Sequence, residues 1–528
     1  MADAGSTAES SPWAPLRQST FRLLWPAVVV SYLGLWMQTV GAQWLVVSAP
    51  NAGGLVALVQ TAALLPLMLL ALPAGVLADV FDRRWLLLTV QVYIFIVAGS
   101  LAVLTAVGLV TPVLMLVFTF LLGIGAAVQL PTWQAVLPEL VPRNQLGTAT
   151  RLEMVGVNVG RSVGPAIAGV IIAVSGVATV FAVNALSVIF LAVALLRWRR
   201  PATVSSTGRE RFAPALRAGG RYVWHEPMVR RILLRTVLFV APGAVLWALL
   251  PLLARQVLGL GAGAYGALFG ALGLGAIVAA LVMGRVRDHL STNRLLFAAG
   301  ALFAAVLVVI VLLANFVVSL CLLMFAGVAW TAVVSTLNAE LQIFLPVWVR
   351  GRALAMYLVT FAGTQALASV AWGQVTERVG VQTTFLIGAG VMVGGVLGGL
   401  FLAVPETGHL DREPAVYWSD PRLAVEPEPD TGPVMVAVHY TIPTSSEPAF
   451  LDAMEALRST RQRTGATSWE LYRDAEHRDQ FVEIFRVPSW EEHLRQHTGR
   501  LTVTDRQIEE AALAFSDPPA RADHLLPP

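Results

Sequence analysis

The sequence is poor in charge and contains no lysine. Only 13% of its 528 residues are charged, and all 36 basic residues are arginine, whereas soluble domains carry roughly 25% charged residues. With 56% hydrophobic residues and a mean hydropathy of +0.69, the composition excludes an ordinary soluble protein and indicates a membrane protein. The lack of lysine also excludes the Gly-x-x-x-x-Gly-Lys loop of ATP-binding proteins.

Cysteine is nearly absent as well. Cys321 is the single one, so an intrachain disulfide is excluded and the sequence offers no redox signal. The first 20 residues contain Asp3 and Glu9 and lack a compact apolar region with a cleavage site. We therefore expect no cleavable signal peptide, and the first apolar run serves as the insertion signal itself.

Long apolar runs fill most of the chain. A bilayer core requires about 20 apolar residues per helix, and helices satisfy every backbone polar group within the lipid. The runs lack the alternation of barrel strands, so the sequence predicts an all-α membrane protein. The twelve expected transmembrane helices cover residues 25–48, 54–78, 86–108, 112–136, 147–174, 177–197, 232–257, 262–284, 294–314, 316–338, 353–376 and 381–404.

Arginines gather in alternate loops between these runs. The Arg-rich loops hold Arg83, Arg84, Arg143, the cluster from Arg197 to Arg231, Arg285, Arg287, Arg350 and Arg352. Arginine and lysine are enriched in cytoplasmic loops, so these loops, and with twelve spans both termini, are expected in the cytoplasm. The predicted location is the cytoplasmic (inner) membrane of a bacterium, with the chain crossing it many times.

Net charge changes sign at Pro405. Residues 1–404 hold 24 Arg against 11 acidic residues, a net +13, whereas residues 405–528 hold 12 against 22, a net −10. We interpret this as a membrane body followed by an acidic cytoplasmic domain. The expected segments are an N-terminal cytoplasmic segment (1–20), a first six-helix half (21–199), a central cytoplasmic loop (200–230), a second six-helix half (231–404), a linker (405–433), an α+β domain (434–515) and a tail (516–528).

The two predicted halves share sequence features. Gly75 to Asp79 follows the second run with the pattern Gly-x-x-x-Asp, and Gly284 to Asp288 repeats it after the eighth run. Loop "PELVPRNQLGTA" similarly matches loop "FLPVWVRGRALA". Two duplicated six-helix halves with a binding site between them are typical of secondary transporters.

These motifs resemble those of a known family. The segment "GVLADVFDRR" (75–84) resembles the cytoplasmic loop signature of the major facilitator superfamily, and "GRSVGPAIAG" (160–169) resembles the Gly-Pro motif of exporters in its fifth helix. Together with "SYLGLWMQTVGAQWL", they make residues 15–404 similar to the enterobactin-exporter-like branch, whose members are called transmembrane secretion effectors. Val80 and Asp82 depart from the general loop pattern, which has a basic residue and a glycine there.

The resemblance implies a gate at the loop between the second and third helices. In the family this network holds the two halves together when the outside is open, and a carboxylate there can bind arginines or a helix N-terminus. The alternative is that the arginines only orient the protein. The gating candidates are Asp79, Arg83, Arg84, Asp288, Gly75 and Gly284.

A hinge is expected in the fifth helix. Gly156, Gly160 and Gly164 recur every four residues and are followed by Pro165, so one smooth face permits close helix contact and a bend. The resemblance implies that Gly160, Gly164 and Pro165 limit leakage. The alternative is plain helix packing.

Substrate and coupling residues are expected among the polar side chains of the spans. Arg161 would cost about 2.5–3.5 kcal/mol if it faced lipid at the helix centre, so it must face protein, water or an interface, and Glu153 is its nearest candidate partner in the sequence. The main substrate or proton-coupling candidates are Arg161, Glu153, Asn158, Gln38, Gln43, Glu340 and Asn338. Further amides that could line a cavity are Gln60, Gln91 and Gln129. Alternatively, Arg161 forms a structural ion pair or anchors at the interface, and the amides only join helices by hydrogen bonds.

The C-terminal region has the order strand, helix, strand, strand, helix. Strand-like "VMVAVHYTI" and "QFVEIFRV" with "VPSWEEHLRQH" resemble the antibiotic-biosynthesis-monooxygenase type of dimeric α/β barrel over residues 434–515, and the expected fold is a ferredoxin-like α+β domain. The resemblance implies dimerisation and a pocket near His493, His497 and Trp469. A metal is not expected, because no His-Glu-x-x-His motif accompanies the histidines.

The predicted function is secondary active export of a siderophore, drug or secondary metabolite by proton antiport and alternating access. We expect a transporter without catalytic residues, cofactor or metal, whose partners are the substrate, protons and the bilayer, and not nucleic acid. Two alternatives stay open: a bifunctional protein whose C-terminal domain binds or oxidises the transported compound, and an importer of the same fold.

Overall fold

A computed structural model describes residues 11–199, 212–405 and 427–527. The chain divides into two compact units. The first contains residues 1–206, 234–337 and 357–403, and the second contains residues 207–233, 338–356 and 404–528. The predicted linker (405–433) and central loop (200–230) lie partly outside the described residues.

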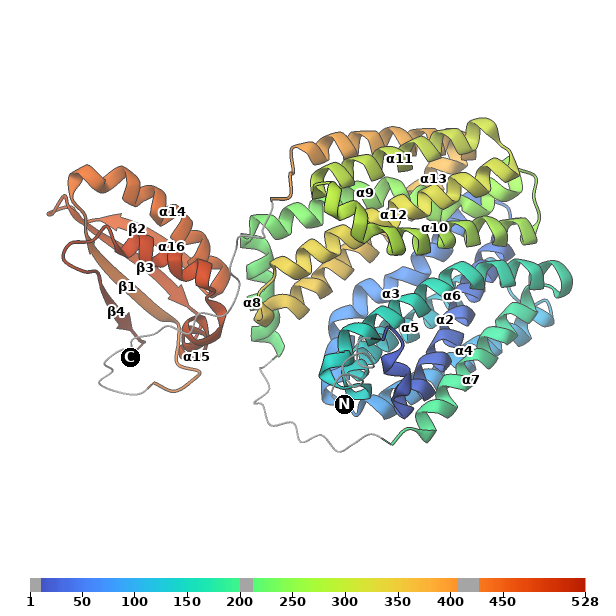
Figure 1. The fold of residues 1–528 in the computed structure, drawn as a ribbon, viewed down its shortest axis with the longest axis horizontal. Coiled ribbons are helices and arrows are strands. Elements are labelled where there is room, and N and C mark those ends of the chain that lie inside the picture. The colour runs from blue at the N-terminus through green and yellow to red at the C-terminus, as the bar shows by residue number, and fades with distance from the viewer. Residues whose placement is uncertain (1–10, 200–211, 406–426, 528) are drawn as a thin grey trace, which may run out of the picture. The chain divides into compact units, whose positions relative to one another are not determined.

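Six long helices form the first half of the first unit (Figure 1). They follow a short 3₁₀ turn, Ala14–Arg17, and are α2 (Ser19–Val46), α3 (Ala52–Val80), α4 (Arg83–Ala106), α5 (Pro112–Leu140), α6 (Leu146–Ser175) and α7 (Val177–Arg197). They match the first six predicted spans. Their ends are set by local signals: Asp82 caps α4 by accepting from the backbone N–H groups of Arg84 and Trp85, and Thr111 caps α5.

The second half is built from five long helices. They are α9 (Pro227–Leu252, continued by a π turn at Leu253–Val257), α10 (Ala262–His289), α11 (Thr292–Leu313), α12 (Phe316–Phe344) and α13 (Val347–Leu400). Among the described residues, eleven helices are long and apolar enough to cross a membrane. The twelve predicted spans become eleven helices because the last two share α13, which breaks at Gly380 with a φ of 81°.

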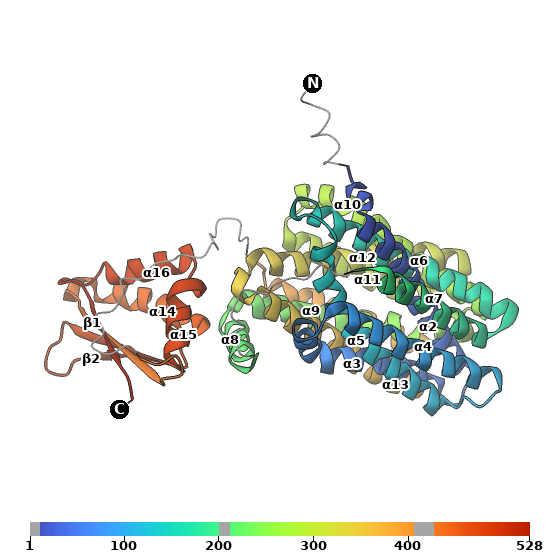
Figure 2. The ribbon, with the colours of Figure 1, turned by 90° about the horizontal axis from the view of Figure 1, so that it is seen from below.

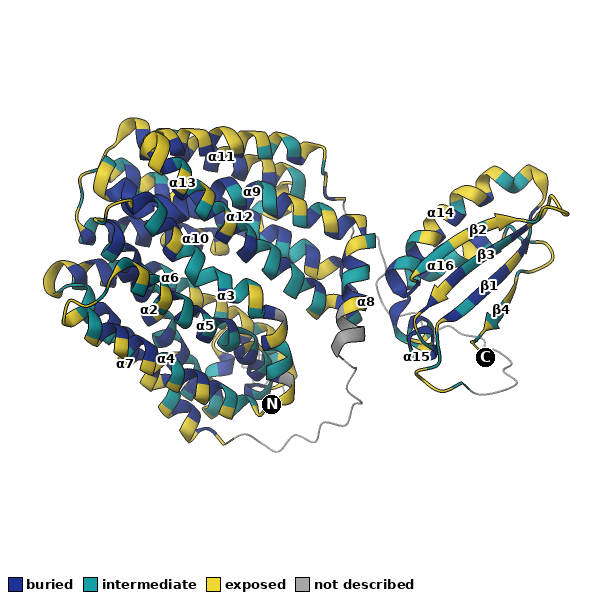
Figure 3. Ribbon diagram, turned by 180° about the vertical axis from the view of Figure 1, so that it is seen from behind, coloured by how far each residue is buried: buried dark blue, intermediate teal, exposed yellow. Residues whose placement is uncertain are grey.

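The two halves lie side by side, as the views in Figures 1 and 2 agree. Exposed residues cover much of the outer helix faces (Figure 3), and many of them are large and apolar, such as Val103, Phe190 and Leu281. A surface of this kind would be unfavourable in water but suits contact with lipid. The helices therefore bury their polar side chains inside the unit and turn apolar ones outward.

Two predicted cytoplasmic loops are shorter than the sequence indicated. The helix α3 continues to Val80 and α4 starts at Arg83, so Gly75 and Asp79 are helical and the connection consists of Phe81 and Asp82. The helix α10 continues to His289, so the whole repeat from Gly284 to Asp288 is helical too. The apolar runs therefore mark only part of each helix, which continues through the charged residues that follow.

The second unit contains an antiparallel four-stranded sheet with the strand order β2-β3-β1-β4. Its elements in chain order are β1 (Val434–Thr441), α14 (Glu447–Thr464), β2 (Ser468–Arg473), β3 (Gln480–Val487), α15 (Trp490–Arg495), a π turn (Gln496–Arg500), α16 (Val503–Leu513) and β4 (Arg521–Leu525). A core of Val436, Phe450, Leu457, Phe485 and their neighbours joins the sheet to the helices. The α+β prediction is confirmed.

Three boundaries in this unit differ from the prediction. The helix α8 (Phe212–His225) occupies the predicted central loop. The predicted last helix is divided by the π turn into α15 and α16. The predicted tail (516–528) contains β4, which pairs with β1. The short strand "RADHL" escapes sequence analysis because it lacks apolar alternation and gains its stability from the edge of a sheet already formed.

Candidate functional site

A cavity of about 290 Å³ lies inside the membrane unit. Small-molecule sites commonly measure about 300–1,000 Å³, so its size is close to the lower end of that range. Both halves contribute to its wall, the first through α2, α3, α4, α5 and α7 and the second through Trp247 of α9 and Phe269 of α10. It is the best candidate for the substrate site.

Aromatic rings form one side of the cavity. Trp36 of α2 lies with its ring centre 6.5 Å from that of Trp247 and 5.9 Å from that of Phe269, and the last two rings are 5.7 Å apart in an edge-to-face arrangement. Trp133 of α5 lines the cavity as well. Flat apolar surfaces of this kind bind aromatic or extended apolar parts of a ligand.

Amides provide the polar part of the wall, and each is held by a second amide. Asn184 donates to Gln38 at 3.2 Å, Gln91 donates to Gln129 at 3.2 Å, and Gln43 donates to Gln60 at 3.3 Å. Gln43 is held in turn by the Tyr265 hydroxyl, which donates to it. Such pairing fixes the amide orientation, so the cavity offers preset donors and acceptors.

Charged side chains are missing from the cavity wall among the described residues. The nearest connection to a charge runs through Tyr32, which lines the cavity and donates its hydroxyl hydrogen bond to the Glu153 carboxylate on α6. The other Glu153 oxygen, Oε2, is buried without a hydrogen-bond partner in the described part of the chain. The Glu153 carboxyl group is therefore separated from the cavity by one side chain, that of Tyr32.

The sequence predicts Glu153 as the partner of Arg161, but the two side chains do not pair in the structure. The Arg161 guanidinium donates to Asn158 Oδ1 at 2.8 Å, one turn away on α6, while Glu153 contacts Tyr32. Neither Arg161 nor Asn158 lines the cavity. Of the predicted substrate candidates, Gln38 lines the cavity and Gln43 lies directly behind it. Asn338 and Glu340 lie in the second unit.

The motif arginines are held within the first half. Arg83 forms an ion pair with Glu139 at 2.7 Å and donates to the Ala135 carbonyl of α5. Arg84 donates to the carbonyls of Leu195 and Leu196, both at 2.8 Å, and so caps the carboxyl end of α7. Asp288 is exposed, and a Cβ at Gly75 or Gly284 would meet nothing within 4 Å. The Asp79 side chain lies outside the described part of the structure.

The glycine stripe of α6 packs against α2. A Cβ on Gly160 would lie 2.8 Å from Cβ of Tyr32, and one on Gly164 would lie 3.0 Å from the Leu33 carbonyl oxygen. Beyond Pro165, the same helix meets α10: a Cβ on Gly169 would lie 2.7 Å from the Ala262 carbonyl oxygen. The predicted stripe therefore continues as a contact between the two halves, which we call the α6–α10 seam (Ser162, Pro165, Gly169, Ala262, Gly266, Gly270 and Gly273).

A second seam joins α3 to α13. The Glu377 carboxylate accepts from the Gly54 backbone N–H at 3.0 Å, at the amino end of α3, and the Thr61 hydroxyl donates to the Ala366 carbonyl at 2.9 Å. Both seams lie toward the end of the bundle opposite the Arg-rich loops, which we call the Arg-poor end. Four hydrogen bonds between the halves lie there or at mid-height.

The predicted C-terminal pocket residues are tightly packed. The Trp469 indole donates to Glu483 at 2.9 Å, and this fully buried carboxylate also accepts from the Tyr440 hydroxyl at 2.9 Å and from Arg461 at 3.2 Å. The rings of His493 and His497 are 4.9 Å apart, and His524 lies 5.0 Å from His493. Burial, reinforced by the neighbouring histidines, lowers the pKa of His493 to about 2.

Most of the cavity wall is not predictable from the sequence. Trp36, Trp133 and Trp247 are ordinary residues of apolar spans until the fold brings them together, and Asn184 was overlooked. The available signal was the set of polar residues inside apolar runs, because an amide in a lipid-facing position is unfavourable and so points inward. That signal identified Gln38, Gln60 and Gln129, which line the cavity. It also selected Asn158 and Asn338, neither of which is part of the wall.

Comparison with known proteins gives the family. Residues 10–526 match the family described as "Transmembrane secretion effector". The chain belongs to this family. The membrane unit of this chain is similar in fold to the nucleoside transporter NupG, with a TM-score of 0.55 at 12% identity over 73% of this chain and 99% of that one. It is likewise similar to a D-xylose-proton symporter, with a TM-score of 0.57 at 15% identity over 73% of this chain and 98% of that one.

A curated relative is the "Staphyloferrin A transporter" of Staphylococcus aureus (strain NCTC 8325 / PS 47). It is 28% identical over 281 residues, which are 53% of this chain and 70% of that protein. The chain is thus a multi-pass secondary transporter of the major facilitator superfamily, and it is related to the "Staphyloferrin A transporter". The family match includes the C-terminal domain, whose likeness to the monooxygenase-type barrel stays a prediction.

Proposed function

We propose that the protein exports a small organic molecule of the siderophore, drug or secondary-metabolite class across the cytoplasmic membrane of a bacterium. In this proposal the Arg-rich end faces the cytoplasm, and alternating access is coupled to proton antiport. The observation that carries the proposal is the cavity between the halves, whose wall combines Trp36, Trp247 and Phe269 with paired amides.

The wall favours a particular kind of cargo. The cluster of aromatic rings favours an aromatic or extended apolar portion, and preset amides favour hydrogen-bonding groups such as hydroxyls and amides. Because the described wall has no charged side chain, a strongly ionic cargo would lose its hydration without gaining an ion pair. An amphipathic molecule of low net charge fits this wall best. The relationship to the "Staphyloferrin A transporter" separately supports a siderophore as the class of cargo.

The Gly-Pro motif supports export, and the seams describe the state in which the cargo would load. The halves are joined toward the Arg-poor end, and a transporter closed on that side receives its cargo from the other. With the Arg-rich loops in the cytoplasm, the cavity would load from the cytoplasm. The fifth-helix motif, at Gly160 to Gly169, resembles that of exporters.

Proton coupling is assigned to Glu153. Its carboxyl group can bind or release a proton while Tyr32, its hydrogen-bond donor, lines the cavity. A cargo that displaces the Tyr32 hydroxyl would remove the donor that stabilises the ionised carboxylate. Cargo binding and protonation of Glu153 are therefore linked through one hydrogen bond.

Transport into inverted membrane vesicles tests the proposal. An aromatic siderophore or a fluorescent amphipathic drug should accumulate when an acid-inside pH gradient is imposed. Glu153→Gln, which mimics the protonated carboxyl group, should abolish gradient-driven uptake and leave cargo exchange without a gradient intact. The matched control is Glu455→Gln, an exposed acid on α14 of the C-terminal domain, which should behave as the wild type. Uptake that ignores the gradient in the wild-type protein would disprove proton antiport.

A further inference from the structure

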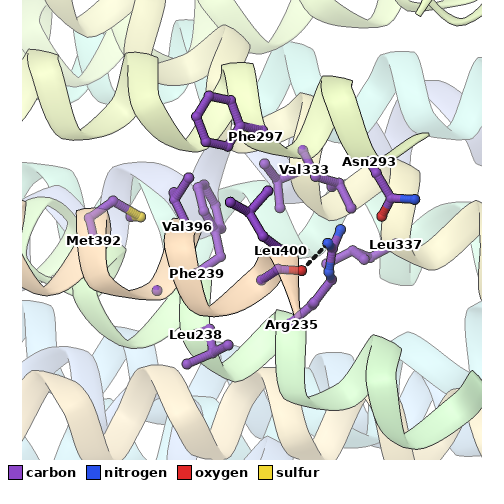
Figure 4. A pocket seen from close by; sticks show the side chains of 13 residues that line it. Arg235, Leu238, Phe239, Asn293, Phe297, Val333, Leu337, Met392, Val396 and Leu400 are labelled. Carbon is purple, nitrogen blue, oxygen red and sulfur yellow. Dashed lines mark hydrogen bonds between the residues drawn. The ribbon is translucent and has the colours of Figure 1, made fainter. Parts of the chain in front are cut away.

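A second cavity lies within the second half, away from the proposed cargo site. It has a volume of about 40 Å³ and is enclosed by α9, α11, α12 and α13. Its wall is apolar except for two residues, Arg235 of α9 and Asn293 of α11. Figure 4 shows the Arg235 guanidinium beside Asn293, with Phe239, Val333, Val396 and Leu400 around it.

Arg235 is a buried cation with unused hydrogen-bonding capacity. Its side chain is 7% exposed, and it donates from Nη2 to the Gly399 carbonyl in the last turn of α13. Its Nε has no hydrogen-bond partner in the described part of the chain. A guanidinium carries five N–H donors, and no carboxylate is among the described residues of this wall. The burial of a charge with so little compensation is unfavourable unless an anion completes the site.

The depth of the cavity points to the lipid headgroups. Asn293 lies in the first turn of α11 and Gly399 in the last turn of α13, so the cavity is at the helix ends that face the Arg-rich side. Apolar side chains continue from it to the outer surface: Phe297 is 42% exposed, Leu400 is 54% exposed and Phe401 is 90% exposed. An anion held by Arg235 can thus be attached to an apolar chain that lies outside the protein.

The size of the cavity selects the ligand. One water needs about 10–15 Å³ measured in this way, so the space holds about three waters, or the anionic oxygens of one phosphate group, and excludes a cargo molecule. Basic pockets between transmembrane helices are known to hold anionic lipid headgroups. We propose that Arg235 binds the phosphate of an anionic phospholipid in the leaflet at the Arg-rich end, with the acyl chains along Phe297, Leu400 and Phe401.

Native mass spectrometry of the detergent-purified full chain, titrated with phosphatidylglycerol, tests this site. Wild type should retain one phosphatidylglycerol about tenfold more tightly than Arg235→Gln, which keeps a donor for Gly399 but loses the charge. The matched control is Arg287→Gln, an exposed arginine near the same end that donates to Thr336, and it should bind the lipid as the wild type does. Equal retention by wild type and Arg235→Gln would overturn the proposal.

A second variant tests the site independently, in case Arg235→Gln does not fold. A Cβ on Gly399 would lie 3.8 Å from the Arg235 guanidinium, an ordinary contact, so Gly399→Leu fills the cavity while keeping the charge, and it should also lose the tight lipid. Two competitors identify the source of the anion. Excess inorganic phosphate should not displace the lipid, and phosphatidylcholine should bind more weakly. Displacement by inorganic phosphate, or equal binding of phosphatidylcholine, would overturn the anionic-lipid assignment.

Discussion

Trp36 of the first half reaches two aromatic rings of the second half at the cavity, while Trp44, further along α2, stacks on Tyr265. Trp36 lies within 6.5 Å of Trp247 and within 5.9 Å of Phe269, centre to centre, so it both lines the cavity and joins the halves across it. A single residue in this position links cargo binding to the distance between the halves. This makes its side chain the best single probe of the proposed site.

Trp36→Ala should weaken cargo binding about tenfold or more. The reason is that truncation of a buried aromatic residue at the centre of a binding site commonly costs about 2 kcal/mol or more of binding free energy. The measurement is the dissociation constant of a fluorescent cargo for the purified protein. Trp85→Ala, which removes a tryptophan that is 59% exposed on α4, serves as the control and should leave the constant unchanged. An unchanged constant in Trp36→Ala would place the cargo elsewhere.

The C-terminal histidines predict an acid-sensitive domain. Burial lowers the pKa of His493 to about 2 and that of His497 to about 4, below the value of about 6.5 in an unfolded chain. The folded domain therefore binds fewer protons than the unfolded one. Its stability is complete above about pH 6.5 and falls as the pH drops toward 4, by about 1.4 kcal/mol per pH unit for each histidine.

Limited proteolysis of the full chain at pH 7 and pH 5, scoring cuts within residues 434–525, measures this loss. His497→Gln should reduce the difference between the two pH values, whereas replacement of the exposed His477 by Gln should not. A domain equally resistant at both pH values would show that the histidines do not control its stability.

At the scale of the elements, the α6–α10 seam depends on glycine. A Cβ on Gly266 would lie 2.8 Å from Gly169 Cα and closer still to the Pro165 carbonyl oxygen. These are backbone atoms, which cannot rotate away, so any side chain must push the two helices apart. Small residues at such crossings are typical of membrane helix packing, where close contact replaces the hydrophobic effect.

Gly266→Ala should lower the unfolding free energy by about 1–3 kcal/mol, the usual cost of overpacking a dense interface. Thermal unfolding in detergent, with a cargo-free sample, measures the change. Gly390→Ala is the matched control, since a Cβ there meets nothing within 4 Å and alanine favours the helix. If both variants had the same unfolding temperature, the seam would be less tightly packed than its geometry indicates.

Helix positions were predictable from the sequence, but helix ends and seams were only partly so. Apolar runs locate the spans because the bilayer imposes their length, yet α3 and α10 continue past these runs through Asp79 and Asp288, where hydropathy no longer reports on structure. The stripe at Gly160 and Gly164 indicated close packing but not its partner. That partner, Tyr32 to Trp36 of α2, depends on a fold that no local pattern contains.

At the scale of the whole membrane unit, Glu377 links the two halves through a helix end. Its carboxylate accepts from Gly54 at the amino end of α3, where Asn51 provides no side-chain cap. A negative charge at a helix amino end contributes about 0.3–1 kcal/mol when exposed. Because the bond exists only while the halves meet, it favours the state closed at the Arg-poor end.

Glu377→Gln should therefore shift the population toward the state open at that end by about two- to fivefold. Spin labels on Leu58→Cys and Val379→Cys in a Cys321→Ser background report the distance between α3 and α13. Arg378→Gln, the adjacent change, controls for altered charge at the same place and should not increase the open population. A distance distribution identical to that of the parent would exclude Glu377 as a latch.

The second unit joins three distant parts of the chain by buried polar contacts. Arg463 of α14 pairs with Glu226 at 3.3 Å and with Asp505, and the Trp348 indole donates to the Arg500 carbonyl at 3.1 Å while the Arg500 guanidinium lies 5.1 Å from the indole centre. The C-terminal domain therefore cannot be removed without breaking these contacts. Truncation at residue 404 would expose both the Glu226 carboxylate and the Trp348 ring. If transport were lost after such a deletion, the exposure of these two buried groups could explain the loss as well as the absence of the domain itself.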